Sequence, residues 1–250
     1  GRPLPARAEA KMNRPICVVV TGEPMPVTRE LRGSFFALIR ETVATDWAGP
    51  WRQVDGRGAD ELPNPAEVAA LILTGSAASV TSREPWMLRL EAYLRRAVDA
   101  NLPILGICFG HQLLGQALGG RVGKNLHGRE IGSVLIEVTR KDPLLGGAPR
   151  FLANSTHVDS VVELPPGAQV LARSALEPFA ALRFAEHVYG VQFHPEVDAE
   201  VMLHYANARR QLLVEEGFDH DALCNAVKDT PDSAAILNRF ARRVTELETR

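Results

Sequence analysis

Continuous apolar runs alternate with segments of helical periodicity over the first half of the chain. Three runs rich in β-branched residues, at 16–20, 68–73 and 102–107, are typical of strands buried on both faces of a parallel sheet. Between these runs, apolar residues recur at helical spacing at Leu31, Phe35, Leu38 and Ile39, and again at Met87, Leu90, Leu94, Ala97 and Val98. This order predicts an α/β fold, with a mostly parallel central sheet and helices on both of its faces.

The pattern changes after Ser133. Shorter alternating runs separated by Pro and Gly predict hairpins or a mixed extension of the sheet at 133–138, 169–174, 179–184 and 187–193. Beyond Pro195 the spacing is helical again, with one set at Val201, Tyr205 and Leu212 and another at Ile236, Leu237, Phe240, Val244 and Leu247. We therefore expect a main domain over residues 14–207 and a helical C-terminal appendage over residues 208–250, with the function where the two halves of the main domain meet.

The first 13 residues carry no fold signal. They contain no apolar core of the kind that a signal peptide needs, and Met12 could be a translation start. We interpret them as a tag or a disordered extension. Apolar runs elsewhere are too short to span a bilayer, so we expect no membrane association.

Charge and cysteine content narrow the classes of function. The chain has 250 residues, 46% of them hydrophobic, which is enough to bury a full core. Lys and Arg number 28 and Asp and Glu number 30, a net charge of −2 with no block of like charge, so no nucleic-acid binding is predicted. Cys17, Cys108 and Cys224 lie far apart and outside any metal-ligand spacing, which argues against disulfides or zinc and favours the cytoplasm.

The sequence around Cys108 carries the strongest chemical signal. An apolar strand leads into Gly106-Ile107-Cys108-Phe109-Gly110, and a helical pattern follows. Glycines two residues before and after the cysteine allow the sharp turn of a nucleophile elbow, which projects the side chain from the carboxyl edge of a sheet. The positive end of the following helix would favour the thiolate. The alternative is an inert buried cysteine, and Cys17 and Cys224 fit that alternative because they lack the elbow.

A second signal lies at His194 and Glu196. His194 ends an apolar strand, and a spacing of two residues sends both side chains to the same side of an extended chain. Pro195 between them favours that extended conformation. An imidazole oriented by a carboxylate is the base and acid that a cysteine nucleophile needs. Taken alone, the pair also fits a surface turn.

Together these motifs resemble the catalytic signature of the class I (triad) glutamine amidotransferases. GICFGHQ at 106–112 precedes QFHPE at 192–196, and the likeness extends over roughly residues 14–207. The resemblance implies a flavodoxin-like α/β fold, with Cys108 as nucleophile, His194 as base and acid, and Glu196 as the third member of the triad.

The resemblance also implies an oxyanion loop and a pocket for the glutamine. The candidate residues are Gly75, Ser76, Phe109, Gln112, Thr156 and His157. Backbone N–H groups near Gly75 and at Phe109 would stabilise the oxyanion, and the others would hold the glutamine. The family loop often reads Gly-Gly-Pro, whereas this chain has Thr74-Gly75-Ser76-Ala77, so the second oxyanion donor differs in detail. Each of these segments could otherwise be an ordinary polar turn.

No cofactor is implied. The segment 119–125, GGRVGKN, lacks the spacing and the final Ser or Thr of a phosphate-binding loop, and HExxH, CxxC and GxGxxG are absent from the sequence. We expect no metal, ATP or dinucleotide. The expected partner is a small molecule, glutamine or a γ-glutamyl compound. The sequence leaves open whether the chain also binds a separate synthetase chain or a second copy of itself.

Several functional alternatives follow from the resemblance. GMP synthase is the biosynthetic member whose glutaminase part is most similar, but its ATP-binding loop has no counterpart after Glu196. Segments 73–94 and 106–132 look like stand-alone γ-glutamyl peptidases, which favours hydrolysis without a partner. A glutaminase subunit that delivers ammonia to a separate synthetase and a non-catalytic module of the same fold are the other hypotheses. A related intracellular peptidase family has histidine directly after the nucleophile, where this chain has Phe109.

Overall fold

A computed structural model describes residues 13–58 and 60–250 of the chain. Its strands are β1 (Ile16–Val20), β2 (Trp51–Asp55), β3 (Ala70–Leu73), β4 (Ile104–Ile107), β5 (Arg121–Lys124), β6 (Glu130–Val138), β7 (Arg150–His157), β8 (Asp159–Glu163), β9 (Gln169–Arg173), β10 (Ala181–Ala185) and β11 (Val188–Val191). Its α-helices are α1 (Pro26–Arg32), α2 (Phe35–Val43), α3 (Pro85–Asp99), α4 (Phe109–Ala117), α5 (Ala199–Ala208), α6 (Arg210–Glu215), α7 (His220–Ala226) and α8 (Pro231–Glu248). The N-terminal extension expected over residues 1–13 lies, except for residue 13, outside the described residues.

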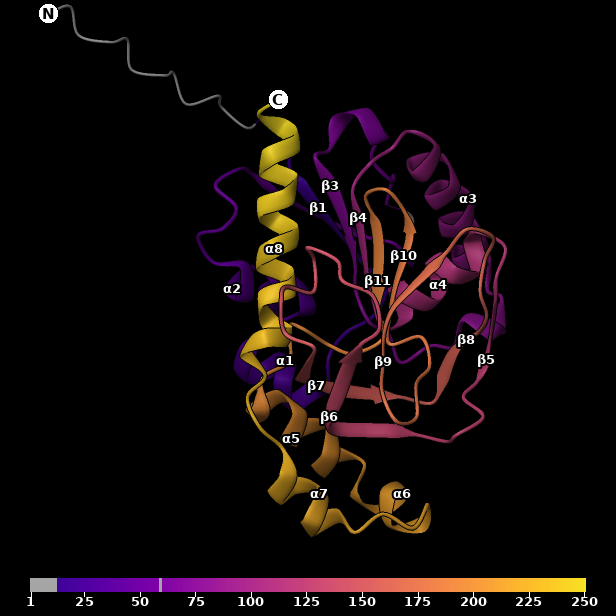
Figure 1. The fold of residues 1–250 in the computed structure, drawn as a ribbon, viewed down its shortest axis with the longest axis vertical. Coiled ribbons are helices and arrows are strands. Elements are labelled where there is room, and N and C mark those ends of the chain that lie inside the picture. The colour runs from indigo at the N-terminus through magenta and orange to yellow at the C-terminus, as the bar shows by residue number, and fades with distance from the viewer. Residues whose placement is uncertain (1–12, 59) are drawn as a thin grey trace, which may run out of the picture.

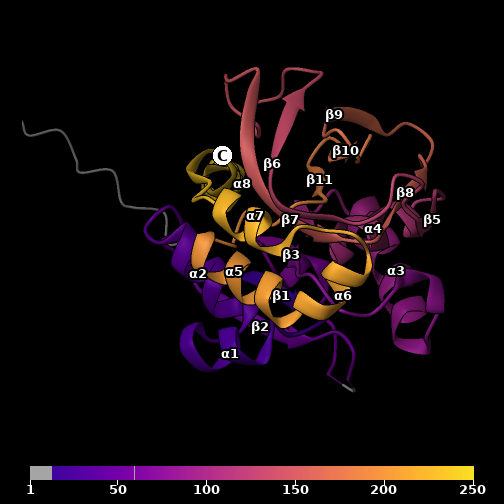
Figure 2. The ribbon, with the colours of Figure 1, turned by 90° about the horizontal axis from the view of Figure 1, so that it is seen from below.

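The large sheet has a parallel half and an antiparallel half. Nine strands follow the order β2-β1-β3-β4-β11-β10-β9-β6-β7, and β5 pairs with β8 in a separate ribbon. Strands β2, β1, β3, β4 and β11 pair in parallel with one another, whereas the pairs from β11 through β10, β9 and β6 to β7 are antiparallel. In Figure 1, α2 and α8 lie on one side of the parallel half, and α3 and α4 lie on the other; Figure 2 shows the same arrangement from below. The predicted α/β fold with a mixed extension is confirmed.

The two faces of the parallel half bury separate apolar clusters. Along β1, Ile16, Val18 and Val20 contact the cluster beneath α2 and α8, while Cys17 and Val19 contact the cluster beneath α3 and α4. Residues one apart on a strand point to opposite faces, so burial on both sides requires an apolar residue at every position. This explains the continuous apolar sequences of β1, β3 and β4, whereas β2, at the edge of the sheet, contains Arg52, Gln53 and Asp55.

Strand register brings the two sequence motifs to one edge. Strands β4 and β11 are parallel neighbours, with Ile107 opposite Val191 at their carboxyl ends. The Cys108 N–H donates to the Val191 carbonyl at 2.8 Å, so the chain segments that follow the two strands begin side by side. The carboxyl edge of an open α/β sheet is where such folds bind ligands.

Two helical predictions are wrong in detail. The apolar spacing places Leu31 on one face with Phe35, Leu38 and Ile39, but Leu31 belongs to α1 and is 62% exposed. Gly33, at φ 89°, ends α1, and Ser34 caps α2, so the two helices have different axes. Leu212 similarly lies in α6 rather than α5 and is 41% exposed. Both errors extend a helical spacing across a helix end.

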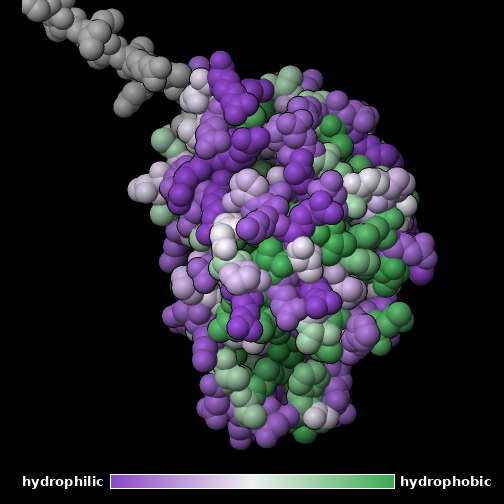
Figure 3. Space-filling model, in the orientation of Figure 1, coloured by the Kyte–Doolittle hydropathy of each residue, from purple (hydrophilic) through white to green (hydrophobic). Residues whose placement is uncertain are grey.

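The C-terminal helix α8 packs on the main core. Ile236, Leu237, Phe240 and Val244 are buried in the cluster that also contains Ile16 and Val18 of β1. The outward face of α8 carries charged residues, and Figure 3 shows a hydrophilic surface in that region. Among the described residues, no helix is both long and apolar enough to cross a membrane.

Removing one α8 side chain is expected to destabilise the whole domain. Phe240 is 2% exposed, so Phe240→Ala would leave a cavity in a shared core and lower the free energy of unfolding by about 3–5 kcal/mol. Chemical denaturation would measure this change in the free energy of unfolding, with Glu246→Ala on the exposed face of the same helix as the control. An unchanged unfolding midpoint for Phe240→Ala would mean that α8 adds nothing to the stability of the main domain.

Candidate active site

Cys108 sits in a strained turn between β4 and α4. It adopts φ 50° and ψ −101°, a conformation that residues other than glycine rarely take. A Cβ added at Gly106 would lie 2.5 Å from the Gly110 carbonyl oxygen, and one at Gly110 would lie 2.7 Å from the Leu73 carbonyl oxygen. Only glycine fits at both positions. This is the elbow geometry that the sequence predicts, and it directs Cys108 to the amino end of α4.

His194 and Glu196 form a buried pair beside Cys108. The His194 Nδ1 and Glu196 Oε1 atoms are 2.8 Å apart, and both side chains are buried. The His194 ring stacks against Phe35 at a centroid distance of 6.3 Å, which fixes the plane of the imidazole. A Cβ added at Gly75 would lie 2.9 Å from His194 Cε1 and 3.8 Å from Cys108 Cβ. A side chain at position 75 would therefore clash with the imidazole and contact the side chain of Cys108.

The charges around His194 favour its protonated form. Burial alone would lower its pKa, but the negative charges of Glu196 and Cys108 outweigh burial and raise the pKa of His194 to about 10. An imidazolium at neutral pH can stabilise a neighbouring thiolate and donate a proton. His111, three residues after Cys108, differs because burial lowers its pKa to about 3, so it stays neutral within the core.

A cavity of about 140 Å³ opens over Cys108. It brings together these residues from five segments: Ser76, Ala77, Ala78, Ser79, Cys108, Phe109, Gln112, Arg129, Thr156, His157, Val158, Asp159 and Arg209. Of the residues suggested by the sequence, Ser76, Phe109, Gln112, Thr156 and His157 thus lie around Cys108. His194 and Glu196 are buried and are not among the residues that line this cavity.

Gln112 and Gln192 link Cys108 to the wall of the cavity. The Gln112 Nε2 group donates to the Asp159 carbonyl at 2.7 Å and to Gln192 Oε1 at 3.1 Å. The Gln192 Nε2 group in turn donates to Cys108 Sγ at 3.5 Å. Sequence reasoning missed Gln192 because its side chain meets the cysteine only through the pairing of β4 and β11.

The side chain of His157 is held in a buried hydrogen-bond network. Its Nε2 atom lies 3.2 Å from Glu130 Oε2, and its Nδ1 atom lies 3.0 Å from the Asp159 carbonyl. Burial acts to raise the pKa of Glu130, but hydrogen bonds from His157 and Ser174 outweigh it and lower that pKa. The network holds the backbone around residues 156–159 in place beside Cys108. No local motif marks Glu130, so the sequence did not reveal it.

The loop after β3 is fixed by threonines. The hydroxyl groups of Thr21 and Thr74 lie 3.2 and 3.1 Å from the Gly75 carbonyl oxygen and donate to it. Because the peptide group is planar and trans, the Ser76 N–H points away from these threonines. The Ser76 hydroxyl accepts from the Ala78 N–H at 3.1 Å, which closes the turn. This loop therefore differs from a flexible Gly-rich loop, since hydrogen bonds hold it without any ligand.

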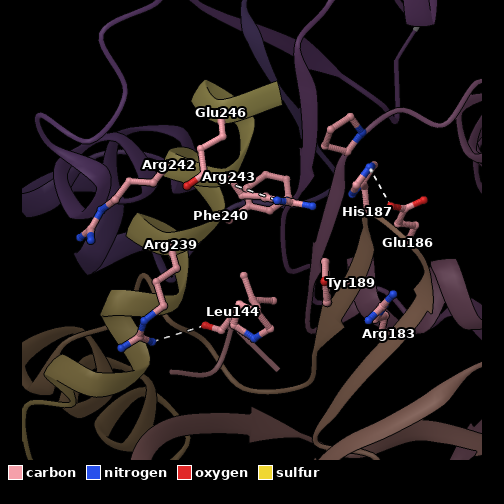
Figure 4. Close-up of a pocket in the computed structure, with 12 residues that line it drawn as sticks. Leu144, Arg183, Glu186, His187, Tyr189, Arg239, Phe240, Arg242, Arg243 and Glu246 are labelled. Carbon is pink, nitrogen blue, oxygen red and sulfur yellow. Dashed lines mark hydrogen bonds and ion pairs between the residues drawn. The ribbon is translucent and has the colours of Figure 1, made fainter. Parts of the chain in front are cut away.

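A larger cavity, of about 390 Å³, lies at the opposite edge of the sheet between α8 and the β10–β11 hairpin (Figure 4). Pro103 and His187, which line it, precede β4 and β11, whereas Cys108 follows β4. Arg243 pairs with Glu246 at 3.4 Å within the lining, whereas Arg242 pairs with Asp46 outside it at 3.0 Å. None of the residues lining this cavity is a cysteine, serine or threonine. Within residues 13–58 and 60–250, no group of His, Cys, Asp and Glu could hold a metal ion.

Comparisons with known proteins point to one family. Residues 55–207 match the family model described as glutamine amidotransferase class-I. The chain is 46% identical over 109 residues to the glutamine-hydrolyzing GMP synthase subunit of Pyrococcus abyssi, across 43% of this chain and 57% of that protein. The corresponding subunit from Methanocaldococcus jannaschii is 36% identical over 140 residues, across 55% of this chain and 70% of that protein.

Other matches are a longer enzyme and two solved structures. The glutamine-hydrolyzing GMP synthase of Thermomicrobium roseum is 44% identical over 128 residues, across 51% of this chain but only 23% of that enzyme. The chain thus spans less than a quarter of that enzyme. Solved structures of glutamine amidotransferases from Thermotoga maritima and Methylobacillus flagellatus share the fold, with TM-scores of 0.68 and 0.69 and identities of 20% and 24%. They cover 94% of this chain and 98% and 93% of their own chains, respectively.

Proposed function

Because the chain belongs to the class I glutamine amidotransferase family, we propose that it hydrolyses the γ-amide of glutamine or of a γ-glutamyl compound. The observation that carries this proposal is the His194–Glu196 pair, with 2.8 Å between Nδ1 and Oε1, buried beside a cysteine in an elbow turn. A thiolate, an imidazolium and an orienting carboxylate are together sufficient for acyl transfer.

In the first half-reaction, the Cys108 thiolate attacks the γ-carbonyl carbon of the substrate. An S–C bond forms, and the carbonyl oxygen becomes an oxyanion. The N–H of Phe109 at the start of α4 and the N–H of Ser76 are the proposed donors to that oxyanion. His194 gives its proton to the leaving nitrogen, the C–N bond breaks, and a γ-glutamyl thioester remains with ammonia or an amine as the first product.

In the second half-reaction, neutral His194 takes a proton from water as the water oxygen attacks the thioester. The tetrahedral intermediate collapses, the C–S bond breaks, and glutamate leaves the Cys108 thiolate facing an imidazolium again. Glu196 keeps the Nδ1 proton in place and so presents Nε2 to the cysteine in both halves. Gln112 and the backbone at Thr156 and His157 are the proposed holders of the glutamyl group.

We further propose that the chain acts without a synthetase. The loop at Gly75 and Ser76 is already held by the hydroxyls of Thr21 and Thr74, so the proposed oxyanion donor needs no partner to position it. The likeness of segments 73–94 and 106–132 to stand-alone γ-glutamyl peptidases supports the same conclusion.

The isolated chain is therefore expected to release glutamate in plain buffer. The measurement is glutamate formed from a panel of γ-glutamyl amides and peptides, at several enzyme concentrations, with no ATP or magnesium. The rate should rise in proportion to enzyme. If every substrate stays intact until a second protein from the same cell is added, partner-dependent hydrolysis replaces this proposal.

One observation favours a second candidate function, partner-dependent glutamine hydrolysis. The Pyrococcus and Methanocaldococcus relatives are named as subunits of a GMP synthase, which indicates that a separate synthetase chain exists for them. In the alternative, this chain would be a glutaminase subunit that delivers ammonia to such a partner. Addition of a purified synthetase should then raise the glutaminase rate with glutamine as the substrate.

A further inference from the structure

The Asp159 carbonyl is a shared hydrogen-bond acceptor in the wall of the active-site cavity. It accepts from Gln112 Nε2 at 2.7 Å and lies 3.0 Å from His157 Nδ1. A carbonyl oxygen can only accept, so Nδ1 must carry a hydrogen and the His157 ring is the donor. All three residues line the cavity over Cys108. The His157 ring therefore holds the same backbone oxygen against which Gln112 is placed.

Glu130 holds the other side of that ring. Its Oε2 atom lies 3.2 Å from His157 Nε2, and its Oε1 atom accepts from the Ser174 hydroxyl. A second buried carboxylate, Glu177, lies 4.0 Å from His157 Nδ1, and its oxygens accept instead from Ser160 and a backbone N–H. Among residues 13–58 and 60–250, Glu130 is thus the one side chain that hydrogen-bonds the His157 ring. It is buried and does not line the cavity, so it would act on a substrate only through His157.

The backbone that His157 anchors faces the nucleophile. The Thr156 carbonyl oxygen lies 3.9 Å from Cys108 Sγ, and residues 156–159 all line the cavity. His157 ends β7 at the edge of the large sheet and is the cross-strand partner of Glu130, the first residue of β6. The strand pairing of β7 stops at this residue, so the Glu130–His157 contact supports the turn where the ladder no longer does.

We propose that Glu130 is a positioning residue for substrate binding, which acts through His157 on the backbone of residues 156–159. This inference rests on the proposed hydrolase function and names a residue that prepares its pocket. A wall that contacts the glutamyl group stabilises the bound substrate and the transition state to the same degree. Its loss therefore raises KM and leaves kcat nearly unchanged.

Two substitutions at position 130 separate hydrogen bonding from packing. Glu130→Leu keeps a similar volume and removes both hydrogen bonds, and an apolar side chain in place of a buried charge need not destabilise a fold. Glu130→Gln keeps both, because its carbonyl can accept from Ser174 and its N–H can donate to Nε2 of a neutral His157. Glu130→Leu should raise KM for a γ-glutamyl substrate about 10- to 100-fold and change kcat by less than about 3-fold. Glu130→Gln should restore KM to within about 3-fold of the wild type.

Asp142→Leu is the matched control for the loss of a buried carboxylate. Asp142 is 5% exposed, close to the 4% of Glu130, and it accepts from the Leu144 N–H at 2.9 Å beside the large cavity at the opposite edge of the sheet. This variant should unfold at a lower denaturant concentration and keep the wild-type KM. A rise in KM as large as that of Glu130→Leu would show that any loss of stability produces the effect, and the inference would fall.

Labelling of Cys108 tests the same inference without turnover. A chloro-ketone analogue of glutamine must occupy the pocket before it reacts, whereas iodoacetamide needs only the thiolate. Glu130→Leu should slow labelling by the analogue about 10-fold or more and leave the rate with iodoacetamide unchanged. Equal slowing with both reagents would place the effect on the nucleophile, and a Glu130→Gln variant as impaired as Glu130→Leu would rule out hydrogen bonding as the cause. Either result overturns the inference.

Failure of the hydrolase proposal would be visible separately. In that case the wild type neither releases glutamate nor reacts with the chloro-ketone analogue, and amide hydrogen exchange decides on Glu130. Faster exchange over residues 154–163 in Glu130→Leu, but not in Glu130→Gln or Asp142→Leu, supports the positioning of this segment by Glu130. Exchange at the wild-type rate in Glu130→Leu rejects it.

Discussion

Replacing Cys108 with alanine is expected to lower the rate of glutamate release by about 10⁴-fold or more, because no other group can form the thioester. The fold should persist, since alanine removes only the sulfur of a residue already held in its turn. Incubation with a chloro-ketone analogue of glutamine should add one label to the wild-type chain and none to Cys108→Ala. Intact mass and peptide mapping would measure both results.

The other two cysteines explain why labelling should be selective. Burial raises the pKa of Cys17 to about 12, although Arg52 opposes this slightly, so its thiol stays protonated at neutral pH. Burial also raises the pKa of Cys224. Cys224→Ala is the matched control and should keep full activity and full labelling. A label on Cys17 or Cys224, or a label that survives Cys108→Ala, would contradict the assignment of the nucleophile.

The sequence predicted the inner parallel strands β1, β3 and β4 well because burial on both faces leaves a local signature, but it missed the edge strand β2, which lacks that signature. The strand at Ile16–Val20 has the predicted bounds, and the predicted runs at 68–73 and 102–107 end where β3 and β4 end. The elbow was equally visible, since its two glycines are required by contacts within a few residues or with the neighbouring strand. Helix ends were harder, because the break at Gly33 depends on backbone conformation rather than on apolar spacing.

The parts of the site that sequence reasoning missed depend on contacts between distant segments. Gln192 meets Cys108 through the pairing of β11 with β4, and Glu130 meets His157 through the pairing of β6 with β7. Arg209, which directly follows α5, lines the cavity with residues from four other segments. Each of these residues is polar, and although Gln192 lies within the QFHPE motif, the sequence assigned no role to its side chain. Their contacts at the site depend on how distant segments pack together, so the sequence alone could not identify them.

The threonines under the Gly75 loop show how a departure from a family motif can be understood structurally. The chain has Thr74 and Ser76 around Gly75 where the family loop often reads Gly-Gly-Pro. Thr21, at the end of β1, donates from its hydroxyl to the carbonyls of Thr74 and Gly75 at 2.8 and 3.2 Å. Side-chain hydroxyls from two strands thus hold a loop that the sequence alone left undefined.

Replacements of His194 and Glu196 are expected to have unequal effects. His194→Ala should lower kcat by about 10³-fold or more, because the imidazole transfers a proton in both half-reactions. Glu196→Gln should lower it less, because a neutral amide can still contact Nδ1 but does not stabilise the imidazolium. Steady-state rates with one γ-glutamyl substrate would measure both, and His127→Ala, at an exposed histidine, is the control. Near wild-type turnover in both variants would remove these two residues from the proposed mechanism.

The pH dependence of Glu196→Gln tests the electrostatic part of this argument. In the wild type, the charges of Glu196 and Cys108 overcome the effect of burial and hold the pKa of His194 at about 10, so the imidazolium persists through neutral pH. Without the Glu196 carboxylate, burial acts against a weaker opposing charge, and the pKa of His194 must fall. Protonation of the leaving nitrogen needs the imidazolium, so the alkaline limb of kcat should move to lower pH. The loss of rate in Glu196→Gln should therefore be larger at pH values of about 9 than at about 6. Profiles with the same alkaline limb in both enzymes would show that Glu196 only orients the ring.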